Sequence, residues 1–163
     1  GFGTQDEAFE TLTPVQTGKT QLMPLVLIDK PGGTYWKTWE KHVREHLLRN
    51  ELISPEDLGF WKITDDPDEA VKFVARFYRN FHSYRFVRGE LVIRLQHALS
   101  ETALEALNED FADIIENEPI RAIDVTEDER GDDDWVDLPR IAFGFDRKSY
   151  ARLHELIGVL NNY

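Results

Sequence analysis

The chain contains no cysteine, has few basic residues relative to acidic ones, and lacks any long apolar run. The absence of cysteine excludes disulfides and thiolate-ligated metal sites but leaves the cellular compartment open. No apolar stretch approaches the roughly 20 residues needed to cross a bilayer, so we expect a cytoplasmic protein with no membrane partner. With 31 acidic residues against 19 basic ones, the formal net charge is −12. Because nucleic-acid binding depends on clustered Lys and Arg, we expect no nucleic-acid partner.

What is present is enough apolar material for a packed core, since 41% of the 163 residues are hydrophobic. This length fits one ordinary domain or two small ones. Near residues 80–83 the hydrophobic periodicity changes from helical spacing to the alternation that is typical of strands. We therefore predict two domains, residues 1–82 and residues 83–163.

The first domain is predicted to be the C-terminal half of a Rossmann-like parallel α/β sheet. A helix is expected over residues 5–16, where Gly18 is well placed to end it. A strand is expected over residues 25–29, because its apolar run is typical of a parallel strand buried on both faces. A second short strand is expected over residues 60–64, and Pro67 after acidic residues marks the start of the next helix.

The second domain is predicted to have the element order ββαββα. Each expected strand has one apolar face to cover, so we predict a small antiparallel sheet with two helices on one side. This arrangement is a ferredoxin-like or ACT-like α+β sandwich. The expected strands are residues 84–87, 91–95, 120–126 and 140–145, with helices starting after Ser100 and near Tyr150.

The most informative motif is the N-terminal run GFGTQDE, residues 1–7. Glycines let the backbone approach a ligand closely, and the free N–H groups at the start of a helix favour phosphate. The run therefore predicts an anion site with the carboxylate of Glu7 about one helical turn beyond it. The alternative is structural, because Thr4 to Glu7 also has the S/T-x-x-E spacing of a capping box. The spacing alone does not decide between the two.

These residues carry a resemblance to a known family. Residues 1–7 resemble the end of the PGGxGTxxE motif of the LOG ("Lonely Guy") family, whose members are often described as lysine decarboxylases. Residues 9–19 and the apolar strand after them also resemble that family. Residues 29–36, DKPGGTYW, lie where family members carry a loop with glycine and tyrosine. The resemblance covers about the first half of the chain.

The resemblance implies a nucleoside 5′-monophosphate phosphoribohydrolase, which cuts the N-glycosidic bond to release a free base and ribose 5-phosphate, with no cofactor. It also implies a homodimer, and nothing in these residues supports a lysine decarboxylase. Three groups of site residues follow from it. They are the phosphate-binding Gly1, Gly3 and Thr4, the catalytic Glu7, and the candidate pocket residues Gly32, Gly33 and Tyr35.

The same resemblance indicates that part of the site is supplied from elsewhere. The leading Pro-Gly of the motif is absent from the chain, and the family's partner arginine lies upstream of the motif. We therefore expect this chain to be the C-terminal part of a longer protein and to be inactive alone, because the sheet and the site would be incomplete. An alternative from another class is a non-catalytic nucleotide-sensing protein. In that protein the same glycine-rich turn binds a phosphorylated ligand, and the second domain transmits the signal that the ligand is bound.

Two further patterns resemble metal-binding motifs. Residues 42–46, HVREH, match the H-x-x-E-H pattern of some zinc peptidases. The helix already has a packing stripe through Trp39 and Leu47, and no third ligand is evident, so we expect surface histidines. Residues 127–134 are rich in carboxylates but lack the alternation of an EF-hand loop, so we expect a solvated, mobile loop. No metal site is predicted.

Overall fold

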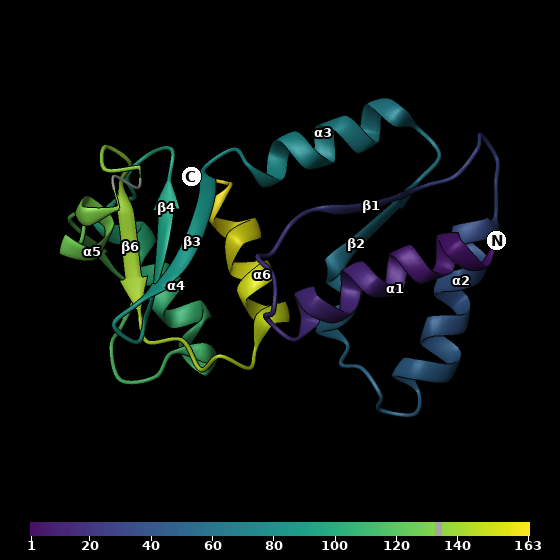
Figure 1. The fold of residues 1–163 in the computed structure, drawn as a ribbon, viewed down its shortest axis with the longest axis horizontal. Coiled ribbons are helices and arrows are strands. Elements are labelled where there is room, and N and C mark those ends of the chain that lie inside the picture. The colour runs from purple at the N-terminus through teal and green to yellow at the C-terminus, as the bar shows by residue number, and fades with distance from the viewer. Residues whose placement is uncertain (133–134) are drawn as a thin grey trace. The chain divides into compact units, whose positions relative to one another are not determined.

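The computed structural model describes residues 1–132 and 135–163 and divides the chain into two compact units, Gly1–Phe77 and Tyr78–Tyr163 (Figure 1). Within the described residues, the first unit carries a parallel sheet of two strands and the second an antiparallel sheet of four. The expected fold class is thus confirmed. Over the same residues, no helix has both the length and the apolar character needed to cross a membrane.

The first unit places the ends of its parallel strands side by side. In chain order its elements are α1 (Phe2–Gln16), β1 (Leu25–Ile28), α2 (Tyr35–His42), a π-helical turn (Val43–Leu48), a 3-10 helix (Glu56–Phe60), β2 (Trp61–Thr64) and α3 (Pro67–Phe77). Leu25 pairs with Trp61 and Ile28 with Thr64, and α3 packs against both strands. Because parallel strands end at one edge, the loops after Ile28 and Thr64 emerge together, where α/β sheets bind their ligands.

Two helix boundaries follow from the residues that the sequence analysis singled out. Gly18, with φ of 67°, ends α1 in the left-handed conformation that favours glycine. Pro67 is the first residue of α3, where its missing N–H has no cost, and Asp66 Oδ1 accepts from the N–H of Asp68 at 2.8 Å. Both predicted boundaries are confirmed.

The second unit forms a sheet in the order β3-β4-β6-β5. Its described elements are β3 (Phe81–Val87), β4 (Glu90–Leu95), α4 (Glu101–Asp110), a 3-10 turn (Ala112–Ile114), β5 (Arg121–Ile123), α5 (Glu127–Gly131), β6 (Arg140–Phe143) and α6 (Tyr150–Leu160). The predicted hairpin turn is confirmed, with φ of 49° at Arg88 and 100° at Gly89. Strand β3 begins at Phe81, earlier than the predicted Tyr84.

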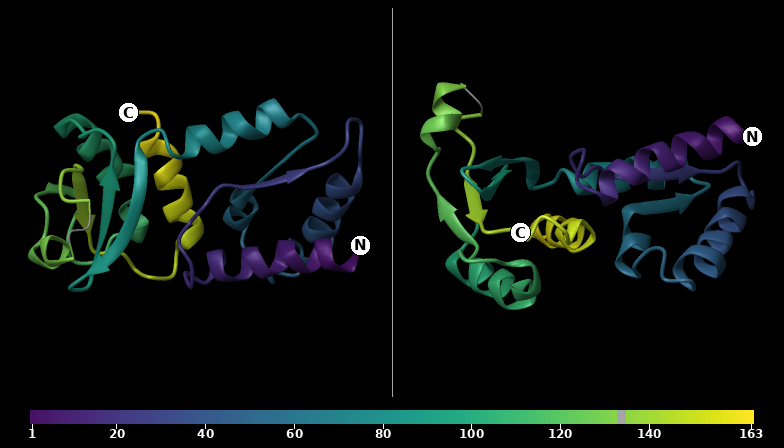
Figure 2. Two further views of the ribbon diagram at one scale, coloured as in Figure 1. Left: turned by 45° about the horizontal axis from the view of Figure 1, so that its top comes forward. Right: turned by 60° about the horizontal axis from the view of Figure 1, so that its bottom comes forward.

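One face of this sheet packs against α4 and α6, which lie on the same side of it (Figure 2). Every residue of β4 after Glu90 and every residue of β6 is buried, and Leu91, Ile93 and Phe143 have no exposed surface. On α6 the buried residues recur at helical spacing, among them Leu153 and Leu160. The buried stripe of α6 fits the two-layer sandwich predicted from the sequence.

The opposite face of the sheet is held by a buried ion-pair network that the sequence analysis did not predict. Arg94 and Arg140 are direct cross-strand partners, and Glu129 of α5 binds both, at 2.9 Å and 3.1 Å. All three side chains are almost completely buried. Burial would raise the pKa of Glu129, but hydrogen bonds from Thr126 and Arg94 and the charge of Arg140 outweigh it, so the pKa is lowered.

The acidic segment therefore differs from the expected mobile loop. Residues Glu127–Gly131 form the short helix α5, which begins with a capping box between Thr126 and Glu129. Arg88 binds Asp128 at 3.0 Å and so joins the hairpin to this helix. The last two residues of the predicted loop, Asp133 and Asp134, lie outside the described residues.

Candidate functional site

The N-terminal motif lies at the start of α1, but it is more helical than predicted. The helix begins at Phe2 rather than near Gln5, and the N–H of Gln5 donates to the carbonyl of Gly1 at 3.3 Å. Gly3 and Thr4 therefore belong to the first helical turn. The alternative capping box of Thr4 with Glu7 does not form, because Thr4 is already inside the helix, and the N-cap is Gly1.

This placement puts the motif residues on one face of the helix end. Residues three and four apart on a helix are neighbours, so Gly3 and Thr4 share a face with Glu7. One helical turn, about 5.4 Å, separates them along the axis. Glu7, Gly3 and Thr4 are all exposed to solvent. The helix N-terminus and the carboxylate are thus accessible together.

The second part of the predicted site is the loop after β1, where Gly32 adopts the left-handed conformation with φ of 70°. Its N–H donates to Asp65 Oδ2 at 2.8 Å, and Asp65 is the first residue after β2. This hydrogen bond lowers the pKa of Asp65. The contact therefore ties the loops after both parallel strands to one another at the carboxyl edge of the sheet.

Gly33 is required by packing within this loop. A Cβ at this position would lie 2.1 Å from Oδ1 of Asp29. The Asp29 carboxylate is held in place, because Oδ1 accepts from the N–H of Lys30 at 2.9 Å and Oδ2 accepts from that of Trp36 at 3.4 Å. Asp29 thus links the end of β1 to the start of α2, and a Cβ at position 33 would force its carboxylate out of this position.

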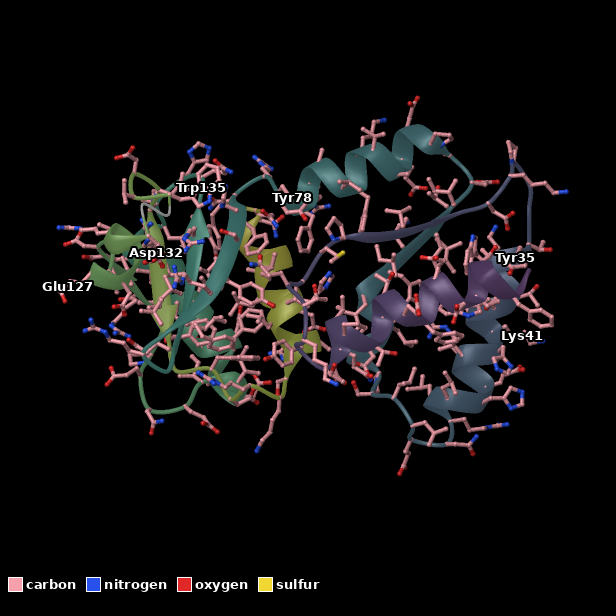
Figure 3. The ribbon with its side chains drawn as sticks, in the orientation of Figure 1. Tyr35, Lys41, Tyr78, Glu127, Asp132 and Trp135 are labelled. Atoms are coloured by element: carbon pink, nitrogen blue, oxygen red, sulfur yellow. The ribbon has the colours of Figure 1, made fainter. Side chains whose placement is uncertain are left out.

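The structure brings the two predicted parts together through one hydrogen bond. Gln5 Nε2 donates to the hydroxyl of Tyr35 at 2.7 Å, which joins the first turn of α1 to the first residue of α2. Tyr35 lies beside this end of α1 in Figure 3. A shallow surface hollow adjoins the contact, and it is lined by Gln5, Tyr35, Thr38, Trp39 and His42.

Sequence reasoning missed two residues of this arrangement, Gln5 and Asp29. Gln5 lies inside the motif and was assigned no role, since nothing in the sequence shows that it reaches Tyr35, 30 residues later. Asp29 follows an apolar strand directly, which is a usual position for a polar residue at the carboxyl edge. This position in the sequence could therefore have identified Asp29 as a candidate site residue.

The histidine pattern does not build a metal site in the described structure. The rings of His42 and His46 lie 4.8 Å apart, and both residues are exposed. Among the described residues, no group of three or more His, Cys, Asp or Glu side chains is arranged to hold a metal ion.

A parallel sheet whose two glycine-bearing segments meet near its carboxyl edge defines the first unit as an α/β segment of the Rossmann type. Residues 1–74 match the family model described as "Possible lysine decarboxylase". The resemblance of this part of the chain to the LOG family is thereby confirmed. Comparison with curated proteins and with solved structures gave no match.

Proposed function

We propose that this chain is part of a nucleoside 5′-monophosphate phosphoribohydrolase, which hydrolyses the N-glycosidic bond to give a free base and ribose 5-phosphate. The family match over residues 1–74 supports the proposal, because it includes the whole N-terminal motif and the loop that contains Tyr35. In the proposed site the 5′-phosphate binds at the start of α1 and the ribose lies beside Glu7.

The observation that carries the proposal is the glycine at position 3. Glycine inside a helix costs about 0.5–1 kcal/mol relative to alanine. Nothing in the described structure lies within 4 Å of a Cβ built at Gly3 or at Gly1. Packing therefore does not require glycine at either position. A phosphate that approaches the backbone closely would require it.

The free amides at this helix end provide the phosphate-binding groups. The first intrahelical N–H is that of Gln5, so the amides of Phe2, Gly3 and Thr4 precede the hydrogen-bonded ladder. The helix dipole adds a partial positive charge at the same place. The hydroxyl of Thr4 can contribute one more donor. This set binds phosphate without a cluster of basic side chains, which agrees with the acidic net charge of the chain.

Glu7 supplies the chemistry in this proposal. Cleavage of the N-glycosidic bond passes through an oxocarbenium-like state, which a nearby carboxylate stabilises while it orients or deprotonates the attacking water. The phosphate contacts hold the ribose in position and break no bond themselves. The hydroxyl of Tyr35, which already accepts from Gln5, still has its own proton to donate to the ligand. The assembly that we propose is a homodimer, as expected from the family.

The test is release of free base from a panel of nucleoside 5′-monophosphates by the native protein that contains this chain. We expect release by the wild-type protein and a loss of at least about 100-fold in the Glu7→Gln variant, since general acid–base groups contribute about 10²–10⁴-fold. Binding of the same nucleotides is measured by calorimetry. Tight binding without release in both proteins would replace the hydrolase with the nucleotide-sensing alternative.

A further inference from the structure

Two histidines of the first unit have no part in the chemistry proposed above. His42 is the last residue of α2, and His46 lies one turn later, in the π-helical turn Val43–Leu48. Both are exposed to solvent, as the sequence analysis expected. Their rings lie side by side, with centroids 4.8 Å apart and planes tilted by 36°. The structure therefore places two potential metal ligands next to each other on one helical surface.

The ring nitrogens of this pair are not used by the protein. Neither imidazole has a hydrogen bond to another residue that the structure describes. The Asn50 side chain does donate to His46, but to its backbone carbonyl, at 2.8 Å from Nδ2. A neutral imidazole offers one ring nitrogen as an acceptor or a metal ligand. Because both side chains are exposed, each ring can turn that nitrogen toward a shared ion.

The distance between the rings fits a single metal ion. Metal–imidazole bonds are about 2.05 Å long and a ring nitrogen lies about 1.15 Å from the ring centre, so a bound ion lies about 3.2 Å from each centre. Two centres 4.8 Å apart then share one ion with an angle of about 100° at the metal. This value lies between the angles of square-planar and tetrahedral coordination, about 90° and 109°.

The backbone beneath the pair has an unusual conformation. The N–H of Arg49 donates to the carbonyl of Arg44, five residues earlier, at 3.2 Å. This is the hydrogen-bonding pattern of a π-helix, and single π-helical turns inside α-helices occur frequently at functional sites. The observation supports a ligand-binding role for this segment independently of the ring distance.

The charges beside the pair do not oppose a cation. Lys41, which Figure 3 labels, lies 3.7 Å from Glu45, and Arg44 lies 3.3 Å from Glu40. Each of these two basic side chains is thus balanced by a carboxylate. The whole chain carries a formal net charge of −12, which raises the local concentration of cations at its surface.

We propose that His42 and His46 together bind one divalent ion of a late first-row transition metal, the class of Cu²⁺, Ni²⁺ and Zn²⁺. Imidazole nitrogen suits these ions, and water completes the coordination, since the pair lacks the third protein ligand of a zinc enzyme. The proposal does not depend on the hydrolase activity. His42 also lines the hollow beside Tyr35, so the bound ion lies next to that hollow.

The test is titration of the full chain with Cu²⁺, which such sites bind most tightly among these ions. Affinity is measured by calorimetry in the presence of glycine, which removes weakly held copper. We expect one tightly bound ion per chain. His42→Gln or His46→Gln should weaken its binding about 100-fold, because two linked ligands bind about 10²–10⁴-fold more tightly than one. The electron paramagnetic resonance spectrum of the wild-type complex should show coupling to two imidazole nitrogens.

Two control variants separate the pair from histidine content. His97→Gln removes an exposed histidine of the second unit and should leave the affinity unchanged. Arg44→His combined with His46→Gln keeps two histidines in the segment but places them two residues apart, where they do not face each other. This variant should bind as weakly as His46→Gln alone. Wild-type affinity in the spacing variant or in either single variant, or a wild-type spectrum without coupling to two imidazole nitrogens, would overturn the proposal.

Discussion

Replacing Glu129 by glutamine tests whether the buried ion-pair network holds the second unit together. The change keeps the size of the side chain and removes only its charge and one acceptor. In the wild-type chain, the carboxylate of Glu129 lies between two arginines from neighbouring strands, Arg94 on β4 and Arg140 on β6. After the change, the two guanidinium groups on this face of the sheet lose the carboxylate that Glu129 places between them.

The expected loss of folding stability is large because the two arginine side chains are buried and are not solvated by water. Arg94 is 5% exposed and Arg140 is 1% exposed in their side chains. Removing one partner of a buried ion pair costs about 3–5 kcal/mol. Small domains have only about 5–15 kcal/mol of stability in total. With an m-value of about 2 kcal/mol per M, the urea midpoint of the second unit should fall by about 2 M.

The assay is urea unfolding followed by circular dichroism, with hydrogen exchange to show where stability is lost. Amides of β4 and β6 should exchange much faster in the Glu129→Gln variant, whereas those of β1 and β2 should not change. Glu127→Gln is the matched control on the same helix, because Glu127 is 89% exposed in its pair with Arg88. Exposed pairs contribute about 0–1 kcal/mol. Equal effects of the two substitutions would refute the role assigned to the buried network.

Two other predictions concern single side chains. Gly33→Ala should destabilise the first unit by about 1–2 kcal/mol in urea unfolding, because the new Cβ would lie 2.1 Å from Asp29 Oδ1. Gly59→Ala, with no atom within 4 Å, should be neutral, and a neutral Gly33→Ala would refute the packing argument. Burial raises the pKa of Asp146, but hydrogen bonds from Ser149 and nearby amides outweigh it and lower the pKa. This carboxylate therefore stabilises the fold fully above about pH 4, the ordinary aspartate value, and the stabilisation is lost as the pH falls through the lower folded pKa. Asp146→Asn should lower the urea midpoint at pH 7 and flatten its fall toward pH 3, and parallel pH profiles would contradict this.

Local signals in the sequence were enough to predict most elements of the fold. The strand expected over residues 25–29 is β1, Pro67 starts α3, and the turn at Arg88 and Gly89 closes the predicted hairpin. In each case the decisive residues are neighbours in the chain. The pattern of apolar residues also placed the correct face of the second sheet against its helices.

The elements that were missed depend on partners distant in the sequence. Helix α5 was predicted as a loop because its acidic residues look like a solvated charge run. Its capping box from Thr126 to Glu129 was visible in the sequence, but the arginines that bury Glu129 are not its neighbours: Arg94 lies 35 residues earlier in the chain. Similarly, the start of α1 was placed too late, because two glycines in the first four residues predict a turn, whereas the structure continues the helix through Gly3.

For the glycines of the candidate site, the structure distinguishes a glycine that packing requires from one that ligand binding would require. Gly33 and Gly3 look alike in the sequence, since both lie in segments that resemble the same family. In the structure, Asp29 gives a packing reason for Gly33, because a side chain there would collide with its carboxylate. Among the described residues, no neighbour explains Gly3, which lies in a helix that glycine weakens. The same substitution to alanine therefore has opposite expected effects at the two positions. At Gly33 it should reduce stability, whereas at Gly3 it should leave stability unchanged or raise it and weaken nucleotide binding by the native protein, as calorimetry would measure.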